Sequence, residues 1–212
     1  MPARPLARMT TLRITAGTLR GRRVDVPRTD VRPTSERARQ AYFDILGPRI
    51  LDARFLDLFA GSGIFSFEAL SRGAKEAVAI DESRKSLAAV EEFAKTLGVP
   101  VRTIAADVFK GIKRLGSTVF DVIYADPPYA WPAYDELLMA IDANVELSPA
   151  AVVAIEHRRR SEPFTTEPQR LRFIRRAEYG EVWISFFSTQ DELSGSSDQN
   201  AEEPDGSPAE SS

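Results

Sequence analysis

The segment RFLDLFAGSGIFSFEALSRG, residues 54–73, joins a strand pattern to a helix pattern through a glycine turn. Residues 54–60 form a short, mostly apolar run that indicates a buried β-strand. Residues 63–72 indicate a helix that Gly73 ends. A strand that runs through a tight turn directly into a helix is typical of α/β folds with a parallel sheet.

Strand and helix patterns continue to alternate after this segment. Strands are predicted at residues 76–81, 101–107, 119–126 and 151–157, and helices at residues 83–98 and 134–141, with a short helix before residue 119. Residues 171–187 contain two strand-like runs about a glycine, which predict an antiparallel pair. We therefore predict an α/β fold: a doubly wound, mostly parallel sheet with an antiparallel C-terminal strand.

The residues before this sheet predict a small β-hairpin and helix extension. Residues 12–16 and 22–26 look like two short strands around a glycine-containing turn, and a helix is predicted to begin after Thr34 or Ser35. The predicted domains are an arginine-rich arm or hairpin at residues 1–33, a main domain at residues 34–187 and a tail at residues 188–212. The tail has seven acids, no base and almost no large apolar residue, so we predict that it is disordered.

Composition excludes several classes of function. The 212-residue chain has no cysteine and one histidine, which excludes disulfides, thiolate zinc sites and multi-histidine metal sites. We therefore expect no metal. The sequence contains no signal-peptide pattern and no run of 18 apolar residues, so we expect a soluble, cytoplasmic protein without a membrane partner.

Arginine is concentrated at the N-terminal end of the chain. The first 39 residues hold ten arginines, no lysine and three acids, and the chain without its tail has 28 bases and 24 acids. An arginine-rich stretch is often only a solvated arm, but these arginines recur through sequence that looks structured, which favours binding to a polyanion. The candidate phosphate contacts are Arg20, Arg22, Arg32, Arg37 and Arg39; Arg37 or Arg39 could instead pair with a nearby acid.

An aspartate ends each of four successive predicted parallel strands: Asp57, Asp81, Asp107 and Asp126. Ligands of doubly wound sheets bind outside the carboxyl ends of the strands, so these side chains should share one edge. A single strand-end aspartate is often only a helix cap. Four of them, with a glycine turn after the first, predict a ligand site.

The turn after the first strand restricts the ligand. Ala60, Gly61 and Gly63 are small enough for a ligand to approach the backbone, but the third glycine of a dinucleotide site is missing. Asp57 would repel a phosphate and attract an amino group. S-adenosylmethionine fits these residues, with Asp57 at the methionine end, Asp81 at the ribose and Asp107 at the adenine amine.

The motifs LDLFAGSG, AAD and DPPY, in this order, resemble those of class I methyltransferases that methylate amino groups. The segments RPTSERARQAYFDIL and EYGEVWISFF narrow the resemblance to the bacterial 16S ribosomal RNA (guanine-N2)-methyltransferases, over residues 14–187. The resemblance implies a Rossmann-like fold, S-adenosylmethionine as cofactor, and ribosomal RNA as partner, within a small-subunit assembly particle and with a monomeric enzyme. Asp81 stands where the family often has glutamate, and the acidic tail lies outside the family pattern.

The stretch YADPPYAWP, residues 124–132, is the predicted reaction centre. The Asp126 carboxylate and the Pro127 carbonyl can accept hydrogen bonds from an exocyclic amine, and Tyr129 offers a ring on which a base can stack. The DPPY form is shared with DNA adenine-N6 methyltransferases. Two alternatives therefore stay open: such a DNA enzyme, and a non-catalytic nucleic-acid-binding module.

Overall fold

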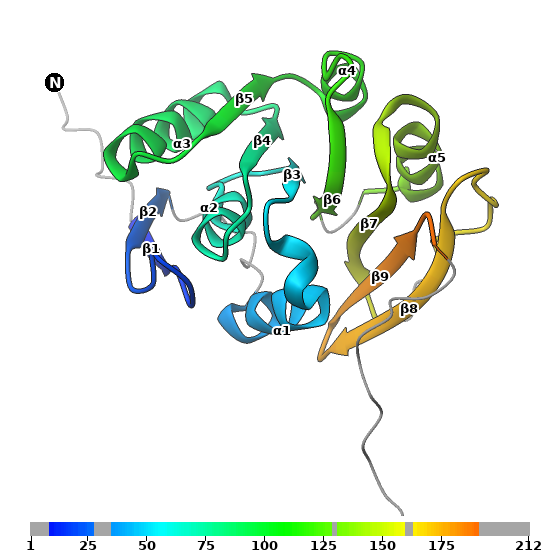
Figure 1. Cartoon of the computed structure of the whole chain (residues 1–212), viewed down its shortest axis with the longest axis horizontal. Helices are drawn as coiled ribbons and strands as arrows, with labels where there is room; N and C mark the ends of the chain where they lie inside the picture. Colours follow the sequence, from blue (N-terminus) through cyan, green and yellow to red (C-terminus); the bar gives the residue numbers. More distant parts are fainter. Residues whose placement is uncertain (1–8, 28–34, 129–130, 160–162, 191–212) are drawn as a thin grey trace, which may run out of the picture.

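The computed structural model describes residues 9–27, 35–128, 131–159 and 163–190. Within them, a seven-stranded sheet has the order β5-β4-β3-β6-β7-β9-β8, and two further strands form a separate hairpin (Figure 1). The strands of the large sheet are β3 (Arg54–Leu58), β4 (Glu76–Asp81), β5 (Val101–Ala105), β6 (Val119–Ala125), β7 (Glu146–Arg158), β8 (Arg172–Tyr179) and β9 (Val182–Ser188). Tyr129, Arg32, and most of the predicted tail, residues 191–212, lie outside the described residues.

The sheet confirms the predicted topology. Strands β3 to β7 run parallel, whereas β9 pairs antiparallel with both β7 and β8. Strand order reverses at β3, because β4 follows it on one side and β6 lies on its other side. The carboxyl ends of β3 and β6 therefore flank the position where doubly wound sheets bind their ligands.

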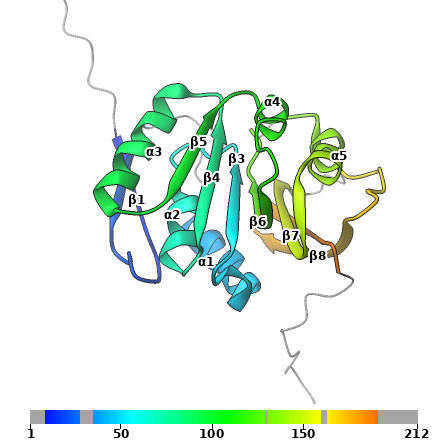
Figure 2. The same cartoon turned by 45° about the horizontal axis from the view of Figure 1, so that its top comes forward.

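Helices cover both faces of the sheet, as the alternating pattern predicts (Figures 1 and 2). One face carries α1 (Glu36–Leu46), with the 3-10 turn η1 (Gly47–Ile50), α2 (Ile64–Ser71) and α3 (Arg84–Leu97); the other carries α4 (Val108–Ile112) and α5 (Tyr134–Asn144). The predicted cap is confirmed at Ser35, whose Oγ accepts a hydrogen bond of 3.1 Å from the Ala38 amide.

The N-terminal hairpin consists of β1 (Met9–Arg13) and β2 (Arg23–Pro27). Its first strand ends at Arg13 instead of continuing to residue 16. Ile14 still bonds to Arg22 and Gly21 of the hairpin, and the chain turns from Thr15 onward to contact α2. The Ile14 side chain is fully buried, and the Thr18 amide donates a hydrogen bond of 2.8 Å to the Ser71 carbonyl. Gly17 passes so close to α2 that a Cβ there would lie 1.8 Å from the Ser71 carbonyl oxygen. The hairpin is therefore fixed to the main domain.

Strand β7 is longer than predicted, starting at residue 146 instead of 151. Its register with β6 shifts after the pair Phe120–Leu147 and resumes at the pair Val122–Val152, so the strand accommodates extra residues in a bulge. Pro149 lies in this irregular part. A proline-containing bulge breaks the alternation on which strand prediction depends.

Candidate active site

Backbone hydrogen bonds join the ends of the four strands that carry the predicted acids. The Ala60 amide donates to the Ile80 carbonyl at 3.0 Å, and the Ala106 amide donates to the Asp81 carbonyl at 3.0 Å. The Asp126 amide donates a longer bond, 3.4 Å, to the carbonyl of Leu58. With neighbouring strands about 4.8 Å apart, the four ends span about 14 Å of one sheet edge. The structure therefore places the predicted acids in one row.

Asp57 is buried, with 2% of its surface exposed. Its Oδ2 accepts hydrogen bonds from the Ser66 amide at 3.0 Å and from Ser66 Oγ at 2.7 Å. The N-cap residue of α2 is Gly63, which has no side chain to cap the helix, so Asp57 satisfies an amide of the first turn instead. The carboxylate is thereby held at the N-terminal end of α2.

Burial raises the pKa of Asp57 from 3.8 to about 7, although the hydrogen bonds from Ser66 act in the opposite direction. A buried carboxyl of this kind would be stabilised in its charged form by a cation beside it. The ammonium group of S-adenosylmethionine is such a cation. Asp57 therefore fits the predicted cofactor, whereas a phosphate group would meet an acid at this position.

Asp81 holds the glycine turn to the next strand. Its Oδ2 accepts a hydrogen bond of 2.8 Å from the Gly61 amide, and its Oδ1 accepts one of 2.7 Å from the Ser83 amide. Ser83 in turn caps α3. Asp81 is half-buried, and each carboxylate oxygen has a second lone pair for a ligand. The residue thus orients the turn, and its remaining lone pairs leave room for the predicted contact with a ribose.

The two glycines of the turn differ in the space around them. Gly61 has a φ of +50°, and a Cβ there would meet only the Phe59 carbonyl oxygen, at 3.9 Å, so this side of the turn is open. At Gly63, with a φ of +70°, a Cβ would lie 2.9 Å from Val90 Cγ2 on α3. Gly63 is therefore required for close packing of two helices. The predicted approach of a ligand is compatible with the open side of Gly61, whereas Ala60 is buried.

Asp107 is the N-cap of α4, because its Oδ1 accepts hydrogen bonds from the amides of Phe109 and Lys110 at 3.2 and 3.3 Å. It is half-buried at the end of β5. The capping function and the predicted contact with an adenine amine use the same carboxylate, and a carboxylate has enough lone pairs for both.

Asp126 directly follows β6 and is half-exposed at the sheet edge. Pro127 is buried and Pro128 is exposed. The Trp131 amide donates a hydrogen bond of 2.8 Å to the Pro128 carbonyl, which ties residues 126–128 to the segment that leads into α5. The predicted position of the acid, at a strand end beside β3, agrees with the structure.

Sequence reasoning missed two features near this edge. Phe59, two residues after Asp57, has a φ of +62°, a conformation that is rare for an aromatic residue and tends to occur at functional sites. Glu156 near the end of β7 is buried, and its Oε2 accepts a hydrogen bond of 2.7 Å from the Tyr124 hydroxyl. No local pattern signals a positive φ at Phe59, and only the neighbouring position of two strands brings Tyr124 to Glu156.

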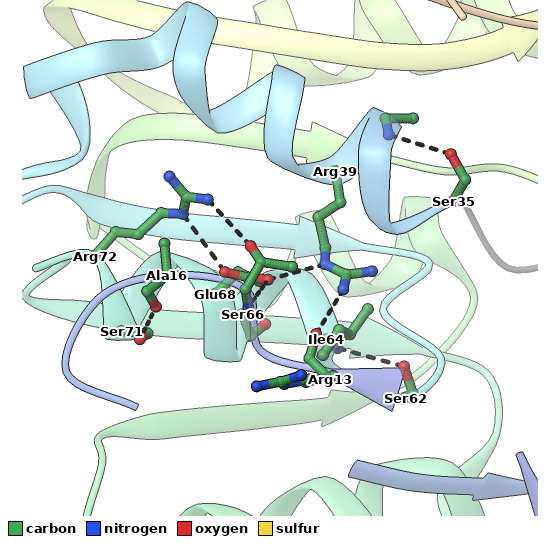
Figure 3. Close-up of polar contacts among 12 residues, drawn as sticks. Arg13, Ala16, Ser35, Arg39, Ser62, Ile64, Ser66, Glu68, Ser71 and Arg72 are labelled. Atoms are coloured by element: carbon green, nitrogen blue, oxygen red, sulfur yellow. Dashed lines mark hydrogen bonds and ion pairs between the residues drawn. The ribbon is translucent and has the colours of Figure 1, made fainter. Parts of the chain in front are cut away.

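The candidate arginines separate into exposed and buried residues. Arg20, Arg22 and Arg37 are exposed. Arg39 is 1% exposed, so its prediction as an RNA contact is wrong: its side chain is enclosed between α1, α2 and the hairpin (Figure 3). The alternative reading, that one of the α1 arginines pairs with an acid, is the correct one for Arg39.

The described part of the chain contains no cluster of three or more acids or histidines arranged to hold a metal ion. None of its helices is long and apolar enough to cross a membrane.

Comparison with known proteins gives the family. Residues 12–188 match the model of the family described as conserved hypothetical protein 95. The chain is 33% identical over 147 residues to ribosomal RNA small subunit methyltransferase D of Escherichia coli, covering 68% of this chain and 74% of that protein. The namesake from Haemophilus influenzae is 30% identical over 152 residues, 68% of this chain and 78% of that protein.

Solved structures agree with this assignment. The structure of yhhF from Escherichia coli superposes with a TM-score of 0.73 at 28% identity, over 84% of this chain and 98% of that one. The Thermus thermophilus 16S rRNA N2 G1207 methyltransferase, in complex with AdoMet and guanosine, gives a TM-score of 0.62 at 17% identity, over 89% of this chain and 52% of that one, and shows the fold alone. The predicted class I methyltransferase fold is thus confirmed. The chain therefore belongs to the family described as conserved hypothetical protein 95, together with the small-subunit ribosomal RNA methyltransferases D.

Proposed function

We propose that this protein transfers the methyl group of S-adenosylmethionine to the exocyclic N2 amine of a guanine in 16S ribosomal RNA. The observation that carries the proposal is the position of Asp126, which ends β6 at the switch point of the sheet, in one row with Asp57, Asp81 and Asp107. Relatives that cover two thirds of the chain are named as small-subunit ribosomal RNA methyltransferases.

The cofactor half of the site uses the first three acids. S-adenosylmethionine, when bound, supplies an electrophilic methyl group on a sulfonium. Asp57 pairs with the ammonium group, Asp81 accepts hydrogen bonds from the ribose, and Asp107 accepts one from the adenine amine. Gly61 leaves its side of the turn open to the cofactor, and the small side chain of Ala60 lies beside it.

The substrate half of the site is the Asp-Pro-Pro segment, residues 126–128, together with Tyr129. An exocyclic amine is a weak nucleophile because its lone pair is delocalised into the ring. Hydrogen bonds donated by this amine to the Asp126 carboxylate and to the Pro127 carbonyl localise the pair and direct it at the methyl group. Asp126 is half-exposed, so the proton that the amine loses can pass to solvent. Tyr129 stacks on the target base.

RNA binding extends over the hairpin. Arg20 and Arg22 are exposed on it and Arg37 is exposed on α1, and we assign these side chains to RNA phosphates. In this proposal the RNA-binding arm comprises residues 1–33, including Arg32, and the methyltransferase domain comprises residues 34–187. The acidic residues after 188 lie outside both.

The natural substrate in this proposal is a small-subunit assembly particle, and the enzyme acts as a monomer. The alternative function, adenine-N6 methylation of DNA, uses the same Asp-Pro-Pro-Tyr chemistry and is an outcome of the test. The experiment incubates the full chain with labelled S-adenosylmethionine and either naked 16S rRNA, small-subunit particles or duplex DNA. Digestion to nucleosides then identifies the product. N2-methylguanosine from the particle is the expected result; N6-methyladenine from DNA, or cofactor binding without transfer to any substrate, would contradict the proposal.

A further inference from the structure

Three aromatic rings meet at the sheet edge, and each comes from a different segment after a strand: Phe59 from the turn after β3, Phe109 from the first turn of α4 and Trp131 from the segment before α5. The Trp131 ring lies 5.1 Å from the Phe59 ring in an edge-to-face arrangement and 5.9 Å from the Phe109 ring in a stacked one. It also contacts Tyr134, the first residue of α5, at 5.7 Å. All distances join ring centroids, and separations in this range are favourable for aromatic pairs.

The positions of these rings in the sequence match those of the site acids. Phe59 follows Asp57 by two residues, and Phe109 follows Asp107 by two residues. The Trp131 amide donates a hydrogen bond to the carbonyl of Pro128, two residues after Asp126. The ring cluster of Phe59, Phe109 and Trp131 therefore connects two cofactor loops to the segment that receives the substrate. The left-handed backbone of Phe59 turns its ring toward this cluster at a cost in local strain.

We propose that Trp131 is a positioning residue for methyl transfer, which holds residues 126–128 in a fixed relation to the loops that bind the cofactor. This inference rests on the proposed function, in which Asp126 orients the substrate amine. Trp131 itself is half-buried and is assigned no contact with the reacting atoms.

The described contacts explain why Trp131 acts on residues 126–128 more than on the cofactor loops. The three predicted cofactor acids are each held by hydrogen bonds that do not involve Trp131. Asp57 is bonded to Ser66, Asp81 to Gly61, and Asp107 to the first turn of α4. Residues 126–128 are instead joined to the segment that carries the Trp131 ring, through the bond of 2.8 Å from the Trp131 amide to the Pro128 carbonyl. Removing the Trp131 ring therefore loosens Asp126 and leaves the cofactor acids in place.

The experiment compares Trp131→Ala, Trp131→Phe and the matched control Phe164→Ala in the full chain. Phe164 is a half-buried ring that packs on the same core cluster; within the described residues its ring contacts are with Tyr134, His157 and Phe187, and none of them is with Phe59, Phe109 or Trp131. Turnover is measured per S-adenosylmethionine-binding site, which calorimetry counts. Hydrogen exchange of the peptide that contains the Tyr124, Ala125 and Asp126 amides is measured without RNA.

Trp131→Ala should lower kcat at least about tenfold, because a displacement of about 1 Å at a reaction centre has effects of this size or larger. Its dissociation constant for S-adenosylmethionine should stay within about threefold of wild type, and its Asp126 peptide should exchange at least about tenfold faster. Trp131→Phe should have a kcat and an exchange rate of the Asp126 peptide close to those of wild type. Phe164→Ala should change neither of these two quantities.

Unchanged exchange of the Asp126 peptide in Trp131→Ala would overturn the inference, and so would equal effects in Phe164→Ala. Parallel loss of kcat and cofactor affinity would also overturn it, because the ring would then support the whole edge. If the wild-type protein methylated no guanine, the proposed function would fail, while the exchange measurement, which needs no RNA, would still decide the role of Trp131.

Discussion

Arg39 on α1 donates a hydrogen bond of 3.1 Å from its Nε to Glu68 Oε1 on α2, and both side chains are buried (Figure 3). The same Glu68 oxygen accepts a bond of 2.7 Å from the Thr15 amide, and a guanidinium nitrogen of Arg39 donates one of 2.7 Å to the Arg13 carbonyl. Glu68 Oε2 accepts a longer bond from Arg72. One buried ion pair thus joins α1, α2 and the hairpin.

Glu68→Gln should destabilise the fold strongly, because it leaves the Arg39 guanidinium buried without a countercharge. A broken buried pair costs about 3–5 kcal/mol in the free energy of unfolding. Arg54→Gln is the matched control, since its ion pair with Glu76 is about 40% exposed and such a pair contributes about 1 kcal/mol or less. Urea denaturation measures both. Equal midpoints for the two variants would contradict a structural role for the buried pair.

The double variant Arg20→Gln/Arg22→Gln tests the RNA surface without removing the hairpin. Deleting residues 1–28 would also remove the backbone that satisfies Glu68 and Ser71, so point variants are the cleaner test. Each lost phosphate contact lowers the slope of log affinity against log salt by about 0.7–0.9. The double variant should lower it by about 1.4–1.8 with cofactor affinity unchanged. Arg54→Gln, whose side chain pairs with Glu76 and is assigned no RNA contact, should leave the slope at its wild-type value. An unaltered slope in the double variant would show that Arg20 and Arg22 do not contact RNA phosphates.

Cofactor affinity should depend on pH through Asp57. The pKa of this carboxyl is about 7 in the folded chain, so below pH 7 the group is mostly neutral and must lose its proton to pair with an ammonium group. The affinity for S-adenosylmethionine should therefore rise between pH 5.5 and about 7, by up to about tenfold per pH unit, and then level off. Calorimetry in two buffers of different ionisation heat counts the proton released. Asp57→Asn should bind more weakly and without this pH dependence; a wild-type affinity that is flat over this range would contradict the assignment.

The stability of the ligand-free protein should change with pH in the opposite direction. The folded-state pKa of Asp57 lies above the ordinary value of 3.8, so the folded chain binds this proton more tightly than the unfolded chain does. The contribution of Asp57 to the free energy of unfolding is therefore largest below about pH 4 and is lost as the pH rises through 7. Asp57→Asn should flatten this part of the stability curve, as measured by denaturation at pH 5 and pH 7.5. Saturating cofactor should offset the loss in the wild type.

Asp81→Ala should weaken S-adenosylmethionine binding by about 1–3 kcal/mol, as for a lost hydrogen bond to a charged group. The structure adds a second effect, because the variant also frees the Gly61 amide, which should then exchange its hydrogen faster. Binding of S-adenosylhomocysteine and of its ribose-deoxy analogue separates the two effects. If Asp81 contacts the ribose, the variant should lose much less affinity for the deoxy analogue. Equal losses for both ligands would mean that Asp81 acts only through the turn.

Asp126→Asn should lower methyl transfer by about 10²–10³, because the amide replaces a charged acceptor at the reaction centre. Cofactor affinity and the unfolding midpoint should stay near wild type, since Asp126 is half-exposed. Asp135→Asn is the control: this acid accepts hydrogen bonds from the Thr165 and Thr166 amides and has no part in the proposed reaction. Turnover of Asp126→Asn within a few-fold of wild type would mean that Asp126 only ends the strand and has no catalytic role.

Much of the site could be predicted from sequence because it follows local rules. A parallel strand ends where its apolar run ends, so the acids after the strands are visible in the sequence, and the sheet must bring them to one edge. Asp57, Asp81, Asp107 and Asp126 were found in this way. The two arginines of the segment SERAR show the limit: Arg37 and Arg39 look alike in sequence, yet one is exposed and the other is buried.

By itself, the sequence determined the fold class, the row of acids and the family, since alternating periodicity and motif order are properties of the chain alone. Only the tertiary structure decided which groups are desolvated and which rings meet. Burial raises the pKa of Asp57, Glu68 is enclosed by three elements, and Trp131 lies against Phe59 and Phe109. These relations join residues that are far apart in the chain. They depend on the packing of separate helices and loops against one another, which no local pattern records.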